Sequence, residues 1–335
     1  MPKAFLHKNK PLALIASLSI VLLFRLGNFF EPVAESSGAG ILYPFLRVEV
    51  WPALVQVLVS VAMLVISAAI FDLILTRFNI LGSISGYPLF FFAVFASLHP
   101  AMGSMSPAVL ALPFIGAACW ALLINYSEKR GQFTALWSGL FLAFAALFYA
   151  PFILLFPFGI VALATLKPAS GREFIAQSMG FLLPFGFAYA VFYLSDYHGA
   201  RWPLPGYVDL LNFFDAFSSD WDIWMVAVLV FGLLNFALFI SFNQMSTYKI
   251  LVRRFFVVLI MLPAFLVLAF MMSPLPDVGA FWPVVFPFSL LLSRLFIDFR
   301  SKAFLRLLLG LVLLIALLAH FNYYFGGDFT FKLVN

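Results

Sequence analysis

Two acidic residues at the end of the first apolar stretch are the strongest candidates for chemistry in this sequence. Glu31 and Glu35 follow the run that ends at Phe30. A spacing of four would place both carboxylates on one face of a continuing helix, although Pro32 disfavours that continuation. Carboxylates at such a position can act as a general base or hold a divalent cation. The alternative is two ordinary solvated acids at a helix end.

Three arginines are candidates for binding an anionic group. Arg25 lies in the last third of the first apolar stretch, where a charged side chain is costly and is a functional hypothesis by default. A guanidinium there suits a phosphate, such as that of a lipid-linked donor. The alternative is that Arg25 snorkels toward the nearer membrane interface. Arg47 and Arg201 lie in the two longest connections and are further candidates for holding a donor phosphate.

His99 and an aspartate pair add weaker signals. His99 stands in the turn before Pro100 and could serve a reacting group, although a lone histidine is usually structural. Asp220 and Asp222 have the spacing at which two carboxylates share a metal–diphosphate, but so short a pattern is common by chance. The single cysteine, Cys119, excludes a cysteine metal site and an intrachain disulfide. No GxxxxGKS, HExxH, GxSxG or GxGxxG motif occurs, which argues against an ATP-driven pump acting alone.

The composition indicates the elements that must position these side chains. Hydrophobic residues make up 64% of the chain and charged residues 10%, and the mean hydropathy is +1.09. Soluble domains carry about 25% charged residues, so this chain could not cover a water-facing surface. In lipid each backbone amide needs a partner within its own segment, which a helix provides. Long continuous apolar runs such as 54–75 and 255–272 favour helices over the alternating strands of a membrane barrel.

The sequence therefore predicts an all-α, polytopic transmembrane bundle of about eleven spans, forming a single membrane domain over residues 1–335. The two predicted spans that flank Tyr149-Ala150-Pro151, at 134–149 and 151–166, are both short. They form either a hairpin or one kinked helix, and the kinked form would move the C-terminus to the other side. The alternation of basic residues between the two sides would fail after residue 150 in the kinked form, so the charge pattern favours the hairpin and an outer C-terminus. We predict spans at residues 11–30, 52–75, 80–98, 106–125, 134–149, 151–166, 174–194, 223–242, 253–272, 280–297 and 303–321.

The placement of basic residues predicts the orientation. With the N-terminus in the cytoplasm, the outer connections hold only Arg47, Arg201 and Lys332, which follows the positive-inside rule of an inner-membrane, multi-pass protein. Most acids then fall outside, chiefly in the longer outer loops 31–51 and 195–222. The basic charge faces anionic lipid and does not indicate nucleic acid. The predicted cytoplasmic cations are Lys3, Lys8, Lys10, Arg77, Lys129, Arg130, Lys167, Arg172, Lys249, Arg253, Arg254, Arg294, Arg300, Lys302 and Arg306.

Three features together resemble the GT-C superfamily of membrane glycosyltransferases. Acids follow the first span, the segment 42–50 mixes apolar and charged residues as a surface helix would, and the run 139–151 followed by an apolar return looks like a short central hairpin. The opening at 8–12 and the stretches 78–81 and 87–91 are also similar to a family of uncharacterised bacterial inner-membrane proteins.

The GT-C resemblance implies a membrane glycosyltransferase-like protein that uses a polyprenyl-phosphate-linked sugar at the outer face. Glu31 or Glu35 would deprotonate an acceptor hydroxyl, Arg25 or Arg47 would hold the donor phosphate, and His99 would complete the acceptor side.

Two other function classes stay open. A non-catalytic scaffold or lipid-handling subunit of an envelope assembly, with membrane-protein partners, would tolerate neutralisation of the outer acids. A transporter would need a polar cavity at mid-membrane depth, for which the spans offer only Asn235 and a few serines. No chain of buried acids or histidines crosses the bilayer, and no pair of matching halves is evident.

Overall fold

The structure is a computed structural model, and it describes residues 10–26, 40–46, 48–81, 86–103, 105–128, 131–168, 170–194, 221–244, 248, 250–272, 282–298 and 302–325. Within these ranges the regular elements are helices, which confirms the predicted all-α class. Eleven α-helices occupy them, one in each segment that the sequence predicts as a span. They are α2 (Lys10–Phe24), α3 (Ala53–Arg77), α4 (Tyr87–Phe95), α5 (Pro107–Asn125), α6 (Gln132–Phe148), α7 (Leu155–Leu166), α8 (Gly171–Leu194), α10 (Trp221–Gln244), α11 (Ile250–Met271), α12 (Trp282–Asp298) and α13 (Lys302–Phe325).

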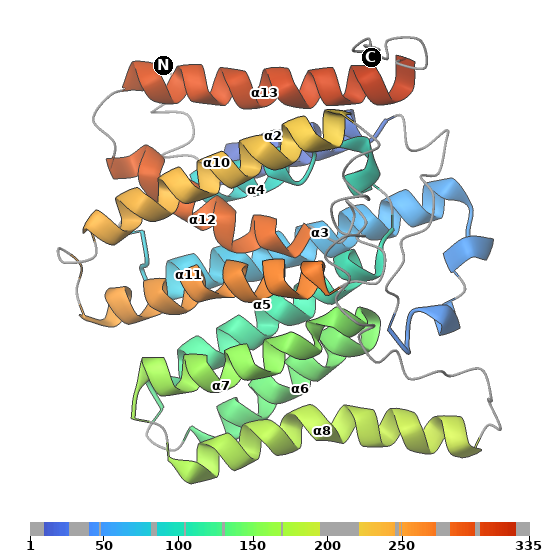
Figure 1. The fold of residues 1–335 in the computed structure, drawn as a ribbon, viewed down its shortest axis with the longest axis vertical. Coiled ribbons are helices and arrows are strands. Elements are labelled where there is room, and N and C mark those ends of the chain that lie inside the picture. The colour runs from blue at the N-terminus through green and yellow to red at the C-terminus, as the bar shows by residue number, and fades with distance from the viewer. Residues whose placement is uncertain are drawn as a thin grey trace, which may run out of the picture.

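The helices lie side by side in a stack that runs from α8 at one edge to α13 at the other (Figure 1). Helix α8 packs on α6, α6 on α5, and α5 on α3, while α7 packs on α11. Helix α12 contacts α4, α10 and α11, and α10 contacts α13. Because the helices are roughly parallel or antiparallel, the bundle has two ends at which side chains from distant parts of the chain meet.

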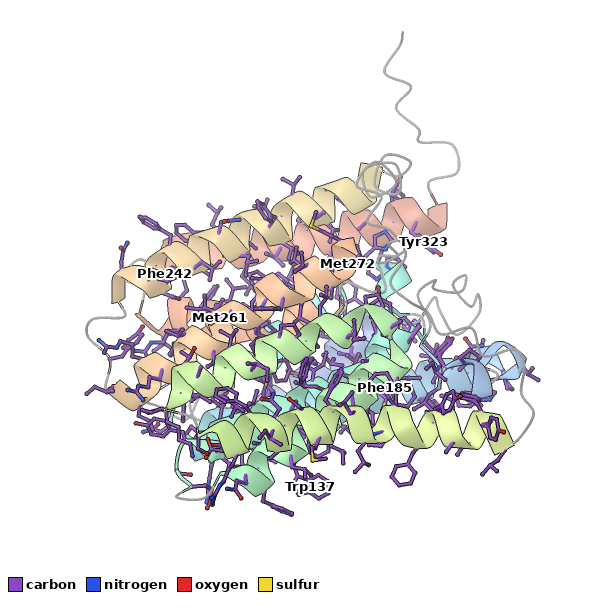
Figure 2. The ribbon with its side chains drawn as sticks, turned by 60° about the horizontal axis from the view of Figure 1, so that its bottom comes forward. Trp137, Phe185, Phe242, Met261, Met272 and Tyr323 are labelled. Carbon is purple, nitrogen blue, oxygen red and sulfur yellow. The ribbon has the colours of Figure 1, made fainter. Side chains whose placement is uncertain are left out.

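Five of the described helices are long and apolar enough to cross a membrane, judged by length and composition. They are α3, α5, α8, the Met225–Asn243 part of α10, and α11. Shorter apolar stretches lie in α2, α6, α7, α12 and α13. Large apolar side chains also project from the outside of the bundle, as Trp137 and Phe242 do in Figure 2. This combination fits a membrane protein, because lipid solvates such a surface and water does not.

Helix α4 is shorter than the predicted span at 80–98. It has nine residues, which at about 1.5 Å per residue cover only half of a bilayer core of about 30 Å. Pro88 lies in the first turn of α4, where a missing amide does no harm. At the other end the helix stops before His99-Pro100, and η4 (Pro100–Gly103) follows. A residue that precedes proline is driven away from helical geometry, so the chain turns here.

The segment predicted to be a surface helix also differs. Residues 42–50 form two 3₁₀ turns, η2 (Pro44–Leu46) and η3 (Val48–Val50), instead of one amphipathic α-helix. Pro44 is the first residue of η2, a position at which its missing amide costs no hydrogen bond. The side chain of Gln56, at the start of α3, donates to the backbone oxygens of Val48 and Trp51 at 3.1 and 3.0 Å and so fixes the second turn.

The segment around Pro151 is a hairpin. Tyr149 has extended backbone angles (φ −130°, ψ 104°), and η5 (Ala150–Leu154) then leads into α7, which returns along α6 (Figure 1). The amides of Gly40 and Leu42 donate to the carbonyl oxygens of Phe148 and Leu147 at 2.7 and 2.9 Å. A Cβ at position 40 would run into the oxygen of Leu147, so only glycine allows this approach. Residues 40–42 of the first long loop are therefore held at the tip of the hairpin.

Helices α6 and α8 cross at glycines. A Cβ on Gly139 of α6 would run into the backbone oxygen of Gln177, and a Cβ on Gly180 of α8 would run into that of Leu136. In each case the obstacle is the main chain of the facing helix. Small residues permit such close approach between membrane helices, where dispersion contacts replace the hydrophobic effect as the source of association.

Candidate functional site

The first candidate site begins with Arg25, just after the last residue of α2. Its side chain is only 2% exposed, and its Nη1 donates to the Oγ of Ser60 on α3 at 3.1 Å. The side chain therefore does not project from the surface of the protein. The guanidinium instead points into the bundle. A positive charge there attracts an anion much more strongly than it would at the water-exposed surface.

Helix α13 reaches the same place through His320. The ring nitrogens of His320 lie 2.8 Å from the backbone oxygen of Ala316 and 3.1 Å from that of Phe24, the last residue of α2. The rings of Phe24 and His320 also meet edge to face, with centroids 4.9 Å apart. The last described helix therefore fastens the end of the first described helix.

His99 joins this group from the turn after α4. It is 2% exposed, and its ring centroid lies 5.7 Å from that of Tyr323, one turn after His320 on α13. Helix α13 thus contacts the end of α2 next to Arg25 through His320, and contacts His99 through Tyr323. The sequence predicts Arg25 as a phosphate-binding residue and His99 as a catalytic residue. We call Arg25, Ser60, His99, His320 and Tyr323 the Arg25 cluster.

Reasoning from the sequence did not select His320 or Tyr323, because both lie at or just beyond the end of an apolar predicted span. The sequence signal that could have identified them is the change from a leucine-rich run to the polar and aromatic residues His320-Phe321-Asn322-Tyr323. The other predicted site residues, Glu31, Glu35, Arg47 and Arg201, lie outside the described residues. Within the described ranges, no group of three or more His, Cys, Asp or Glu side chains could hold a metal ion.

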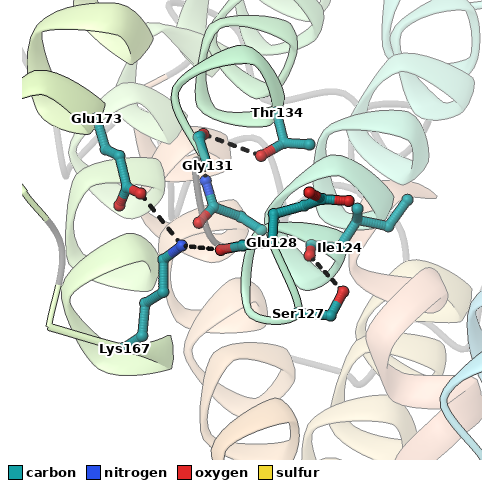
Figure 3. Close-up of polar contacts among 8 residues, drawn as sticks. Ile124, Ser127, Glu128, Gly131, Thr134, Lys167 and Glu173 are labelled. Atoms are coloured by element: carbon teal, nitrogen blue, oxygen red, sulfur yellow. Dashed lines mark hydrogen bonds and ion pairs between the residues drawn. The ribbon is translucent and has the colours of Figure 1, made fainter.

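A second polar group lies where α5, α6, α7 and α8 are joined. Lys167, just after α7, lies 3.1 Å from the Oε1 of Glu173 and donates to the backbone oxygen of Glu128 at 2.9 Å (Figure 3). Glu173 is 5% exposed, so the ion pair is largely shielded from water. Two loops that are distant in sequence are therefore tied together by one ammonium group.

Further cations fasten the same end of the bundle. Arg254 on α11 donates to the carbonyl oxygen of Leu166, at the end of α7. Arg294 on α12 donates to the carbonyl oxygen of Leu81 at 2.8 Å and to the hydroxyl of Tyr248 at 3.2 Å. Carbonyl groups at helix ends lack intrahelical partners, and basic side chains satisfy them. Several cations of the predicted cytoplasmic side therefore have a structural role.

Removing the ammonium group of Lys167 is expected to destabilise the protein. Lys167→Met should lower the free energy of unfolding by about 2 kcal/mol, since it leaves the Glu173 carboxylate buried without its counter-charge. The double variant Lys167→Met/Glu173→Gln should cost less than the sum of the single variants, because neither charge is then left alone. Thermal unfolding in detergent measures both effects. The exposed neighbour Arg172→Gln is the control and should change little.

The chain also matches a known protein family. Residues 41–329 match a family of unknown function, DUF6427. The chain belongs to this family. The DUF6427 match includes Ser60, His99, His320 and Tyr323 and begins after Arg25. Neither a curated protein nor a solved structure matches the chain.

Proposed function

We propose that this member of the DUF6427 family is a multi-pass inner-membrane protein with a glycosyltransferase-like activity. It would use a polyprenyl-phosphate-linked sugar at the outer face of the membrane. The single observation that carries the proposal is that α13 contacts both the end of α2, where the buried Arg25 follows, and His99 at one end of the bundle.

The orientation follows from the charges at the two ends. Lys167, Arg254 and Arg294 fasten helix ends at one side of the bundle. By the positive-inside rule that side faces the cytoplasm. The Arg25 cluster lies where α2 and α13 end, opposite the start of α13 at Lys302, and would therefore lie toward the outer leaflet.

The chemistry of the cluster suits a phosphate leaving group. Sugar transfer from a polyprenyl phosphate releases an anion, and a nearby cation stabilises the charge that develops on it. Arg25 offers a planar, permanently charged group that matches phosphate oxygens. His99 offers a nitrogen that can donate or accept a proton. Glu31 and Glu35, which follow Arg25 closely in the sequence, are proposed as the base that deprotonates the acceptor hydroxyl.

A deletion strain tests this function. We expect the strain to lose a sugar from its surface glycans and to accumulate the lipid-linked donor. Wild-type protein should restore the profile, whereas Glu31→Gln/Glu35→Gln, made in equal amount, should not.

An unchanged glycan profile in the deletion strain would refute the proposal. Full rescue by the double variant would refute the assignment of Glu31 and Glu35. Either result would favour a scaffold or lipid-handling subunit, and co-purification with envelope proteins would then be the next measurement.

A further inference from the structure

Both ring nitrogens of His320 face carbonyl oxygens. One nitrogen lies 2.8 Å from the oxygen of Ala316, one turn earlier on α13. The other lies 3.1 Å from the oxygen of Phe24, at the end of α2. Both distances are within hydrogen-bonding range, and a carbonyl oxygen can only accept.

A neutral imidazole cannot satisfy this arrangement. It has one N–H group and one nitrogen lone pair, so either tautomer would donate to one carbonyl and turn its lone pair toward the other. An imidazolium has two N–H groups and satisfies both oxygens. We propose that His320 makes both contacts as an imidazolium and acts as a positioning residue, which ties the end of α2, and with it Arg25, to α13.

We call the two hydrogen bonds of the His320 ring to Ala316 and Phe24 the His320 clamp. The surroundings of His320 determine whether the ring carries the proton that both hydrogen bonds need. Burial is the main influence that opposes a proton on His320, and His99 of the same cluster opposes it further. Tyr323 lies one turn further along α13. The two carbonyl oxygens favour the charged ring. A bound anion would also favour it, so anion binding and protonation of His320 are thermodynamically linked.

The identity of that anion rests on the proposed function, whereas the clamp itself rests on the two His320 contacts alone. If the site takes a polyprenyl phosphate, His320 becomes protonated more readily when the lipid is bound. The end of α2 is then held most firmly when the donor is in place. The protonation of His320 would then regulate how firmly α2 is held, although no sequence motif marks this residue.

The protonation state can be measured directly by solid-state NMR of the full chain in lipid bilayers. The protein is labelled with ¹⁵N-histidine, and the chain has only four histidines. His320 is assigned by its absence in His320→Gln. If that variant fails to fold, a variant that lacks His7, His99 and His198 leaves His320 as the sole signal.

We expect both His320 nitrogens to give imidazolium signals at about pH 5, and one of them to lose its proton as the pH rises toward about 8. Signals of the Arg25 guanidinium should shift in the same pH range, which a merely structural histidine would not cause. A His320 ring that stays neutral wherever the protein is folded would overturn the proposal.

A second titration with polyprenyl phosphate in the bilayer tests the link to the ligand. The His320 transition should move to higher pH, since the anion favours the proton. A parallel titration with inorganic phosphate shows whether the headgroup alone suffices. If His320 titrates as expected but neither phosphate moves the transition, the clamp stands and the phosphate ligand of the proposed function is wrong.

Discussion

The proposed function predicts that Arg25→Gln slows sugar transfer by about a hundredfold or more. Loss of one group that stabilises a developing anion typically costs a factor of about 10² to 10³. Glutamine keeps hydrogen-bonding capacity toward the Oγ of Ser60 but removes the charge from a position that is only 2% exposed. The measurement is the rate at which membrane vesicles from the complemented deletion strain consume the lipid-linked donor, at matched amounts of protein.

Two further variants separate charge from geometry. Arg25→Lys keeps the charge but loses the planar fork, so it should retain an intermediate rate. Arg77→Gln removes an exposed cation from the last turn of α3 and should leave the rate unchanged. If Arg25→Gln consumes the donor as fast as wild type, the cluster does not bind the leaving phosphate.

Gly180→Ala is expected to lower the free energy of unfolding by about 3 kcal/mol, the upper part of the usual range for overpacking. The added methyl group would run into the backbone oxygen of Leu136 on α6. A main-chain atom in a helix cannot rotate away, so α6 and α8 would have to separate. Thermal unfolding in detergent, followed by loss of the monodisperse peak on size-exclusion chromatography, measures the loss.

The same helix supplies a matched control. Gly186 also lies in α8, but a Cβ there would meet nothing within 4 Å. Gly186→Ala should therefore be neutral or slightly stabilising, because alanine favours a helix by about 1 kcal/mol over glycine. Equal midpoints for the two variants would mean that α6 and α8 do not make this close crossing. The comparison does not depend on any assumption about activity.

The sequence by itself determined the class of protein and the positions of its helices. Continuous apolar runs leave few options in lipid, and every predicted span contains an α-helix of the described structure. Hydropathy predicted the ends of the helices less well where prolines occur. Pro88 and Pro100 stand before and after the helical part of the predicted span at 80–98 and explain why α4 is short. An average of hydropathy over about 20 residues cannot register a single missing amide.

The hairpin at Pro151 needed more than local sequence. Proline permits either a kink or a reversal, and the choice depends on what the second half can pack against. Here α7 packs against α11 and α6, and the backbone amides of Gly40 and Leu42 donate hydrogen bonds to the tip of the hairpin. The charge pattern had favoured the reversal, because only a hairpin keeps the later basic residues on the same side as the earlier ones.

The membership of the candidate site was decided by tertiary structure alone. Arg25 and His99 stood out in the sequence because charge or a titratable ring is rare in apolar segments. His320 and Tyr323 did not, since their value depends on α13 lying across the end of α2. His320 contacts the oxygen of Phe24 across 296 positions of sequence, and no periodicity or spacing encodes such a meeting. Helix packing sets it, through the shapes of many side chains acting together.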